Sequence, residues 1–97
     1  MDMESLMAQA QDLQAKISAA QDSLAEMQVK GIAGNGAVVV AMTGKYDLIS
    51  VVVRPETLSL GAEKVSELVA DAYKDAKSKA DVLIDKVMSQ VTGGLSE

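Results

Sequence analysis

Apolar residues in the N-terminal segment recur at the spacing of a helix seam. From Ala10 onward they alternate three and four residues apart, the 3.5-residue period of a coiled coil, for about three heptads. The positions are Leu6, Ala10, Leu13, Ile17, Ala20, Leu24 and Met27. Asp2 is suited to cap such a helix, and Gly31 is suited to stop it. The pattern predicts a helix over residues 3–29.

Turn residues and β-branched runs alternate in the middle of the chain. Gly34-Asn35-Gly36 is a strong turn signal, because Asn and Gly tolerate a positive φ. The runs 37–42 and 48–53 are apolar at nearly every position, and Gly44-Lys45 between them is a second hairpin candidate. Pro55 ends the last run because it cannot donate to a strand ladder. With a short strand at 29–33, the pattern predicts three antiparallel strands within residues 29–54.

The helical pattern resumes after Gly61 and predicts a second helix over residues 62–91, with a stop at Thr92-Gly93-Gly94. That helix would be about 45 Å long, whereas a globule of this chain length is roughly 32 Å across. We therefore expect residues 1–97 to form a single α+β domain in which two long helices flank a small sheet. The helices must project from it as arms.

A second copy of the chain is the expected partner, because both faces of an apolar sheet need cover that one small chain is too short to provide. We expect a homodimer. The predicted interface residues are Val38, Val40, Val51, Val53, Leu83 and Val87.

The composition argues against an enzyme. The chain has no Cys and no His, which removes disulfides, thiolate nucleophiles and the usual metal ligand and proton-transfer residue. The pairs Asp71/Asp75 and Asp81/Asp85 have a spacing that metal ligands use, but interleaved lysines favour a solvated, salt-bridged helix face. A phosphate-cradling loop at residues 34–36 is disfavoured because a strand follows it, not a helix. We expect no catalytic residue, metal, cofactor or small-molecule substrate.

No segment is typical of a membrane protein or a secretory leader. The longest apolar run, residues 37–42, is far shorter than the ~20 residues that span a bilayer. Asp2 and Glu4 stand where a signal peptide carries basic residues. Together with the absence of Cys, this favours a cytoplasmic location.

The local excess of positive charge lies at Lys74, Lys77 and Lys79, in a chain whose net charge is −5. These lysines are candidates for contacts with nucleic-acid phosphates, and Lys16 and Lys86 are weaker candidates. The alternative is that the i,i+4 pairs Asp75–Lys79 and Lys77–Asp81 neutralise the cluster.

The kind of nucleic acid is limited by the scarcity of aromatic residues and arginine. With two Tyr and no Phe or Trp, the chain has no stacking platform for single strands. Arg54 is the one arginine, which leaves little for guanine readout. Any DNA binding should be to duplex, directed at the backbone and weakly selective for sequence.

The ordered set of motifs resembles the YbaB/EbfC family of bacterial nucleoid-associated proteins over nearly the whole chain. The matching segments are Leu6-Met7, Gln9-Ala10-Gln11, Leu13-Gln14, Gly34-Asn35-Gly36-Ala37-Val38, Met42-Thr43-Gly44, Val51-Val52-Val53-Arg54-Pro55, Asp71-Ala72, Asp75-Ala76, Lys79 and Val91-Thr92-Gly93-Gly94. The resemblance implies an α-β-β-β-α chain in a tweezer-like homodimer, DNA binding and a place in the cytoplasmic nucleoid. It carries no catalytic residues.

The sequence therefore predicts a homodimeric nucleoid-associated protein that binds duplex DNA and affects DNA organisation or gene expression. The alternative is a protein-interaction dimer that keeps the fold and holds a protein partner with its apolar arms.

Overall fold

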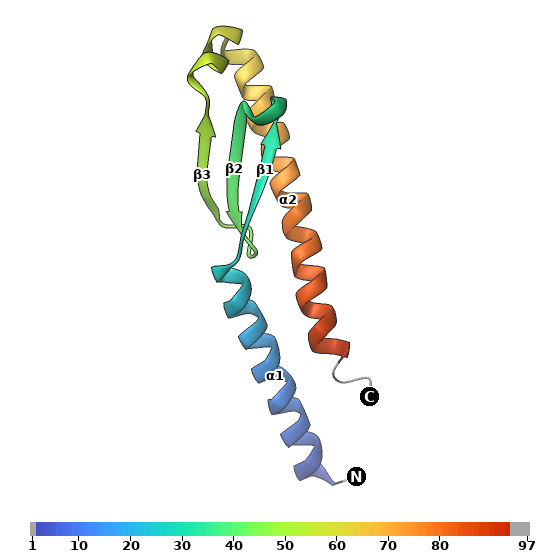
Figure 1. Ribbon diagram of the computed structural model, residues 1–97. Helices are drawn as coiled ribbons and strands as arrows, with labels where there is room; N and C mark the ends of the chain where they lie inside the picture. Colours follow the sequence, from blue (N-terminus) through green and yellow to red (C-terminus); the bar gives the residue numbers. More distant parts are fainter. Residues whose placement is uncertain (1, 94–97) are drawn as a thin grey trace.

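The computed structural model describes residues 2–93, which form two long helices and a three-stranded sheet (Figure 1). The elements are α1 (Met3–Glu26), β1 (Gln28–Ala33), β2 (Val38–Thr43), β3 (Leu48–Val53) and α2 (Ala62–Gly93). Short 3-10 turns lie at Gly34–Gly36 and Pro55–Leu60. The predicted α-β-β-β-α order is confirmed. Helix α2 runs two residues past the predicted end, and the predicted stop at Gly94 lies outside the described residues.

Helix α1 begins at its predicted cap and ends earlier than predicted. The side chain of Asp2 accepts a hydrogen bond from the Ser5 amide at 2.8 Å. Met27 is already extended, at φ −85° and ψ 147°, and Gln28 pairs with Thr43 in the sheet. The predicted end at residue 29 is therefore wrong by three residues. The seam pattern continues to Met27, but strand pairing takes the chain out of the helix after Glu26.

The sheet is an antiparallel meander with β2 in the centre, so β1 and β3 are edge strands. Gly34, Asn35 and Gly36 all have positive φ, at 60°, 58° and 93°, as the predicted turn requires. The β2–β3 hairpin turns at residues 44–47, and a bulge lies at Ala41/Met42. The meander predicted within residues 29–54 is present and begins one residue earlier.

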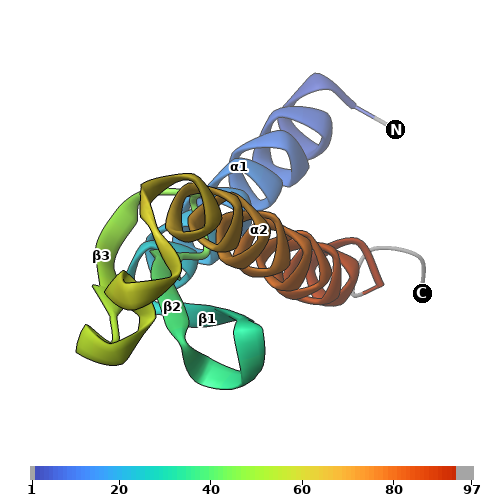
Figure 2. The same cartoon turned by 90° about the horizontal axis from the view of Figure 1, so that it is seen from above.

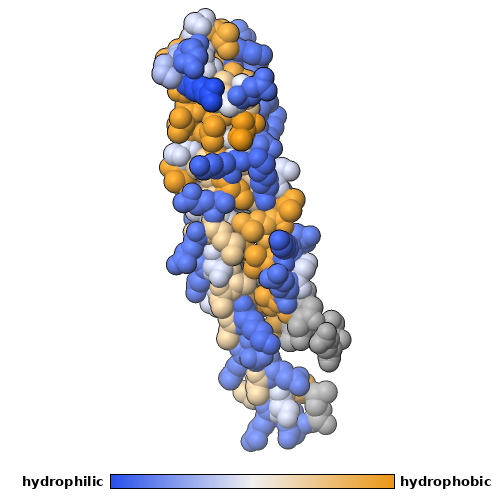
Figure 3. Space-filling view, viewed as in Figure 1, coloured by the Kyte–Doolittle hydropathy of each residue, from blue (hydrophilic) through white to orange (hydrophobic). Residues whose placement is uncertain are grey.

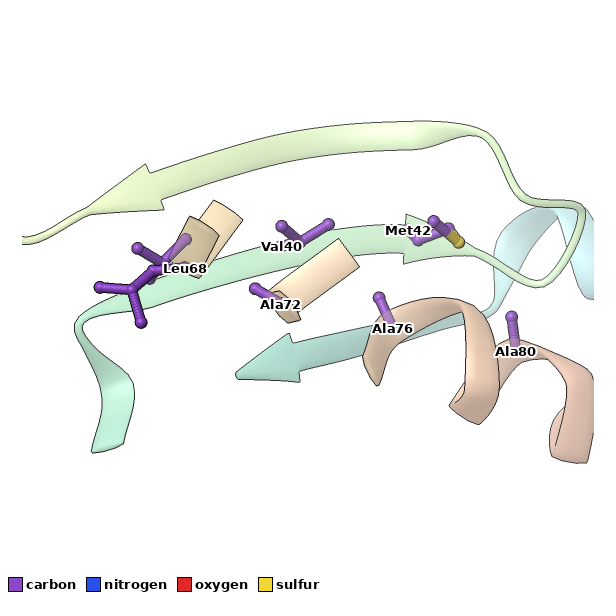
Figure 4. Close-up of a cluster of buried hydrophobic side chains, with 7 residues drawn as sticks. Val40, Met42, Leu68, Ala72, Ala76 and Ala80 are labelled. Atoms are coloured by element: carbon purple, nitrogen blue, oxygen red, sulfur yellow. The ribbon is translucent and has the colours of Figure 1, made fainter. Parts of the chain in front are cut away.

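One face of the sheet packs on α2 and forms the core. Val38, Val40 and Met42 of β2 are fully buried there. They face α2 positions four residues apart, which are Leu68, Ala72, Ala76 and Ala80 (Figure 4). The alanines let the helix backbone lie close to the strands, and the buried apolar surface stabilises the contact.

Gly31 makes that close contact possible and is not a helix stop. It lies in β1, opposite Val40, beneath α2. A Cβ atom at this position would clash with the backbone oxygen of Ala72 and the backbone nitrogen of Ala76. Helix α2 can therefore lie on β1 only while residue 31 has no side chain.

The sheet is not covered evenly. Helix α2 packs mainly on β1 and β2 and leaves β3 largely exposed. Leu48 and Val52 of β3 keep 56% and 57% of their surface exposed. Figure 3 shows the resulting apolar surface at the sheet end of the molecule. As expected, the single chain does not cover both faces of the sheet.

The C-terminal end of α1 is held by the β2–β3 hairpin. The Gly44 amide donates to the carbonyl oxygens of Leu24 and Met27, at 3.0 and 3.1 Å. Leu24 and Ala20 are buried beside it, whereas Met3, Leu6 and Met7 are exposed. The molecule measures 68 × 19 × 16 Å, and from above α1 and α2 diverge (Figure 2). The predicted projecting arms are present.

We expect Gly31→Ala to destabilise the fold by about 1–3 kcal/mol, because the added methyl group meets helix backbone that cannot move aside alone. Urea unfolding followed by circular dichroism measures this change. Ile32→Ala, at an exposed neighbouring position, is the control and should cost less. An unchanged midpoint for Gly31→Ala would contradict the packing described.

Candidate nucleic-acid interface

The lysine cluster of α2 is divided between the two flanks of the helix. Lys74 and Lys77 lie on the β3 flank and border a groove of about 550 Å³ between α2 and β3. The apolar lining of this groove includes Leu48 and Val51 of β3 with Val69 and Tyr73 of α2. Lys79 lies on the β1 flank, because five residues turn a helix by about 140°. The three lysines therefore do not form one patch.

Lys79 is committed to contacts within the chain. Its Nζ lies 3.0 Å from Asp75 Oδ2 and donates to the Lys30 carbonyl oxygen at 2.8 Å. Asp75 Oδ2 also accepts the Ile32 amide at 2.9 Å. The Ile32 hydrogen bond, and then Lys79, hold the pKa of Asp75 below its usual value. Asp75 and Lys79 thus bind α2 to backbone groups at the unpaired edge of β1.

The predicted pairing of Lys77 with Asp81 does not occur. Asp81 Oδ1 instead accepts a hydrogen bond from the Tyr46 hydroxyl in the β2–β3 turn. This bond to a carboxylate raises the pKa of Tyr46, because it favours the protonated phenol. Among residues 2–93, neither Lys74 nor Lys77 has an ion-pair partner. Of the two neutralising pairs predicted, only Asp75–Lys79 is confirmed.

The two weaker lysine candidates, Lys16 and Lys86, lie apart from Lys74 and Lys77. Lys16 is on α1, where its Nζ lies 3.1 Å from Asp12 Oδ2 at an exposed site. It also lines a cleft of about 440 Å³ between the two arms, across from Val87 and Val91. Lys86 is exposed on α2 and, seven residues after Lys79, shares the β1 flank.

The residues predicted for a dimer interface are spread over three places. Val38 and Val40 are 0% exposed in the core of the single chain, where Val40 also lines the groove between α2 and β3, and their place in an interface stays a prediction. Val51 is 41% exposed on β3, and Val53 is half-buried beside it. Leu83 and Val87 are half-buried on α2, where Val87 faces α1.

Tyr46 is the site residue that the sequence did not indicate. Its partner Asp81 is 35 residues away, and no sequence spacing links the two residues. The positive φ of Tyr46, 68°, has no sequence signature either. In the described part of the chain, no group of three or more acidic residues is arranged to hold a metal ion. No helix there is long and apolar enough to cross a membrane.

Residues 1–95 match the model of the YbaB/EbfC DNA-binding family. The chain belongs to this family. A nucleoid-associated protein of Gluconobacter oxydans (strain 621H) is 40% identical over 95 residues, covering 97% of this chain and 89% of that protein. One of Gloeothece citriformis (strain PCC 7424) is 35% identical over 95 residues, covering 98% of this chain and 83% of that protein. The family is a DNA-binding family and not a known enzyme family.

The fold itself is shared with a solved structure. An uncharacterized protein from Helicobacter pylori superimposes with a TM-score of 0.84, over 95% of this chain and 98% of that one. The two sequences are 15% identical. The α-β-β-β-α architecture is therefore compatible with very different surface residues.

We expect Asp75→Asn to lower the unfolding temperature at neutral pH, because the variant loses the charge that binds Lys79. The folded state holds the Asp75 pKa below its unfolded-state value, so this stability is fully present at a pH above the unfolded-state pKa. It is lost as the pH falls through the lower folded value. The difference between variant and parent should shrink accordingly in thermal melts. Asp71→Asn, at an exposed site one turn earlier, is the control, and an equal effect there would contradict this role of Asp75.

Proposed function

We propose that the protein is a homodimeric nucleoid-associated protein that binds duplex DNA mainly through the phosphate backbone, with little sequence selectivity. The family and the names of the relatives support DNA as the ligand and the cytoplasmic nucleoid as the location. The observation that carries the mechanism is the pair Lys74 and Lys77, two exposed ammonium groups on one flank of α2 without a carboxylate partner among residues 2–93.

The charge of the molecule makes this binding weak and dependent on salt. Each chain carries −5, so a dimer carries twice that, −10, and repels DNA at long range. Contacts from Lys74 and Lys77 of both protomers would neutralise four phosphates, which corresponds to a slope of about −3.6 in log K against log salt. Binding should therefore be measurable at low salt and fall steeply as salt rises.

A second copy of the chain supplies the missing cover of β3. This edge strand exposes apolar side chains on both of its faces, including Val51 toward the groove and Val52 on the opposite face. Exposed apolar edge strands are strong association sites. A dimer built around β3 would bury the groove floor and leave the ammonium groups of Lys74 and Lys77 at its rim.

We expect Lys74→Ala/Lys77→Ala to weaken binding to a short mixed-sequence duplex and to make the salt slope shallower by about 2 per protomer. Fluorescence anisotropy at several salt concentrations measures both. Lys45→Ala/Lys64→Ala is the matched control, because it removes the same charge from two exposed lysines that are not candidates for phosphate contact. An equal loss in the control would overturn the site, and no duplex binding by the parent at low salt would overturn the function.

We expect Val51→Asp to convert the dimer into a monomer, because it places a charge in the apolar groove beside β3. Light scattering coupled to size exclusion measures the mass. Val82→Asp is the control, since Val82 is 67% exposed on α2 and lines none of the clefts described. A monomeric parent would contradict the dimer, as would a dimeric Val51→Asp protein.

A second candidate function, a protein-interaction dimer, is favoured by the exposed apolar residues Met3, Leu6 and Met7 at the tip of α1. Under this alternative, Lys74→Ala/Lys77→Ala leaves function unchanged, whereas Leu6→Glu abolishes it. The same lysine variant therefore separates the two candidates.

A further inference from the structure

We propose that Tyr46 is a positioning residue for DNA binding: its hydroxyl holds the Asp81 carboxylate, so that Lys77 stays available for a phosphate. This inference rests on the proposed function and assigns the group that regulates the charge of its site. The hydrogen bond joins the β2–β3 turn to α2 across 35 residues of sequence.

Helix geometry alone would bring Lys77 and Asp81 together. They are four residues apart, the separation at which side chains meet on a helix surface. Two other lysines of the chain form an ion pair at this separation, Lys16 with Asp12 at 3.1 Å and Lys79 with Asp75 at 3.0 Å. No such pair joins Lys77 to Asp81 in the described residues, and Asp81 is bound to Tyr46 instead. The hydrogen bond from the phenol therefore holds the Asp81 side chain in a position where it forms no ion pair with Lys77.

The turn is built to present this phenol. Thr43 Oγ1 accepts the amides of Lys45 and Asp47, each at 3.1 Å, and the Thr43 carbonyl oxygen accepts the Tyr46 amide at 3.0 Å. Tyr46 lies at φ 68°, a conformation that Gly or Asn adopts at lower cost than an aromatic residue. The turn geometry does not itself require a tyrosine. A glycine would fit this backbone conformation but would have no side chain to reach α2.

The size of the effect follows from the pair that Tyr46 prevents. A lysine that precedes its acidic partner pairs less well than one that follows it, and a helix pair of either order is weak. Release of Asp81 in both protomers should therefore lower DNA affinity by about two- to fivefold, not abolish it.

The test is a double-mutant cycle read by fluorescence anisotropy with a short mixed-sequence duplex at low salt. Tyr46→Phe removes the hydroxyl and should weaken binding about two- to fivefold. Asp81→Asn removes the charge that competes with phosphate for Lys77. This substitution should raise the DNA affinity more in the Tyr46→Phe background than in the parent, because Asp81 reaches Lys77 only when the Tyr46 hydroxyl is absent. Asp85→Asn, one turn further along α2, is the control and should give the same gain in both backgrounds.

A purely structural role for the hydrogen bond predicts a different outcome. Asp81→Asn would then give equal gains in both backgrounds, and Tyr46→Phe would weaken binding through lost stability, visible as a lower unfolding temperature. A second variant guards against that effect: Tyr46→Phe should no longer weaken binding when Lys77 is already Ala. Two results would overturn the role of Tyr46 without touching the proposed function. One is an equal gain in affinity from Asp81→Asn in both backgrounds, and the other is an undiminished effect of Tyr46→Phe when Lys77 is already Ala. Absence of duplex binding by the parent protein overturns the proposed function as well.

Discussion

The close contact between α2 and β1 is the constraint on which the rest of the structure depends. It requires a glycine at position 31 and small residues at Ala72 and Ala76, because backbone atoms of the helix occupy the space of any side chain at residue 31. This contact fixes the face of α2 that meets the sheet. It also places the helix over β1 and β2, which leaves β3 uncovered.

That placement gives the two flanks of α2 different surroundings. The β1 flank of α2 is closed by Asp75 and Lys79, which bind backbone groups of Ile32 and Lys30 at the sheet edge. The β3 flank stays open, with an apolar groove and two lysines at its border. The same helix thus has one flank engaged within the chain and one flank available to partners. Under the proposed function, a second copy covers the groove and DNA meets the lysines beside it.

Local signals in the sequence were sufficient to predict the elements and their order. The heptad seam, the glycine-rich turn at residues 34–36 and Pro55 each act over a few residues and predicted the right elements, although the helix predicted from the seam ended three residues too late. Gly31 was misread because its reason lies in tertiary packing: a helix stop and a site of close helix approach look the same in sequence. The burial of Val38 and Val40 beneath α2 was not predicted for a similar reason. A strand that is apolar on both faces does not reveal which face the helix will cover.

The candidate site shows the same division. The Asp75–Lys79 pair follows from i,i+4 spacing and is present, whereas Lys77–Asp81 has the same spacing and is absent. The difference is made by Tyr46, which reaches Asp81 from a turn 35 residues away, in a backbone conformation that no local pattern predicts. Spacing along one helix gives the possible partners. Only the tertiary structure decides between a neighbour on the helix and a residue from the sheet.

The most direct measurement is an NMR titration of the isotopically labelled protein with short duplex DNA at low salt, followed at the lysine side-chain ammonium groups. The open β3 flank predicts that the signals of Lys74 and Lys77 shift together and return as salt is added, while that of Lys79 stays in place. Shifts centred on Lys79 and the β1 flank, or no shift at either flank, would contradict it.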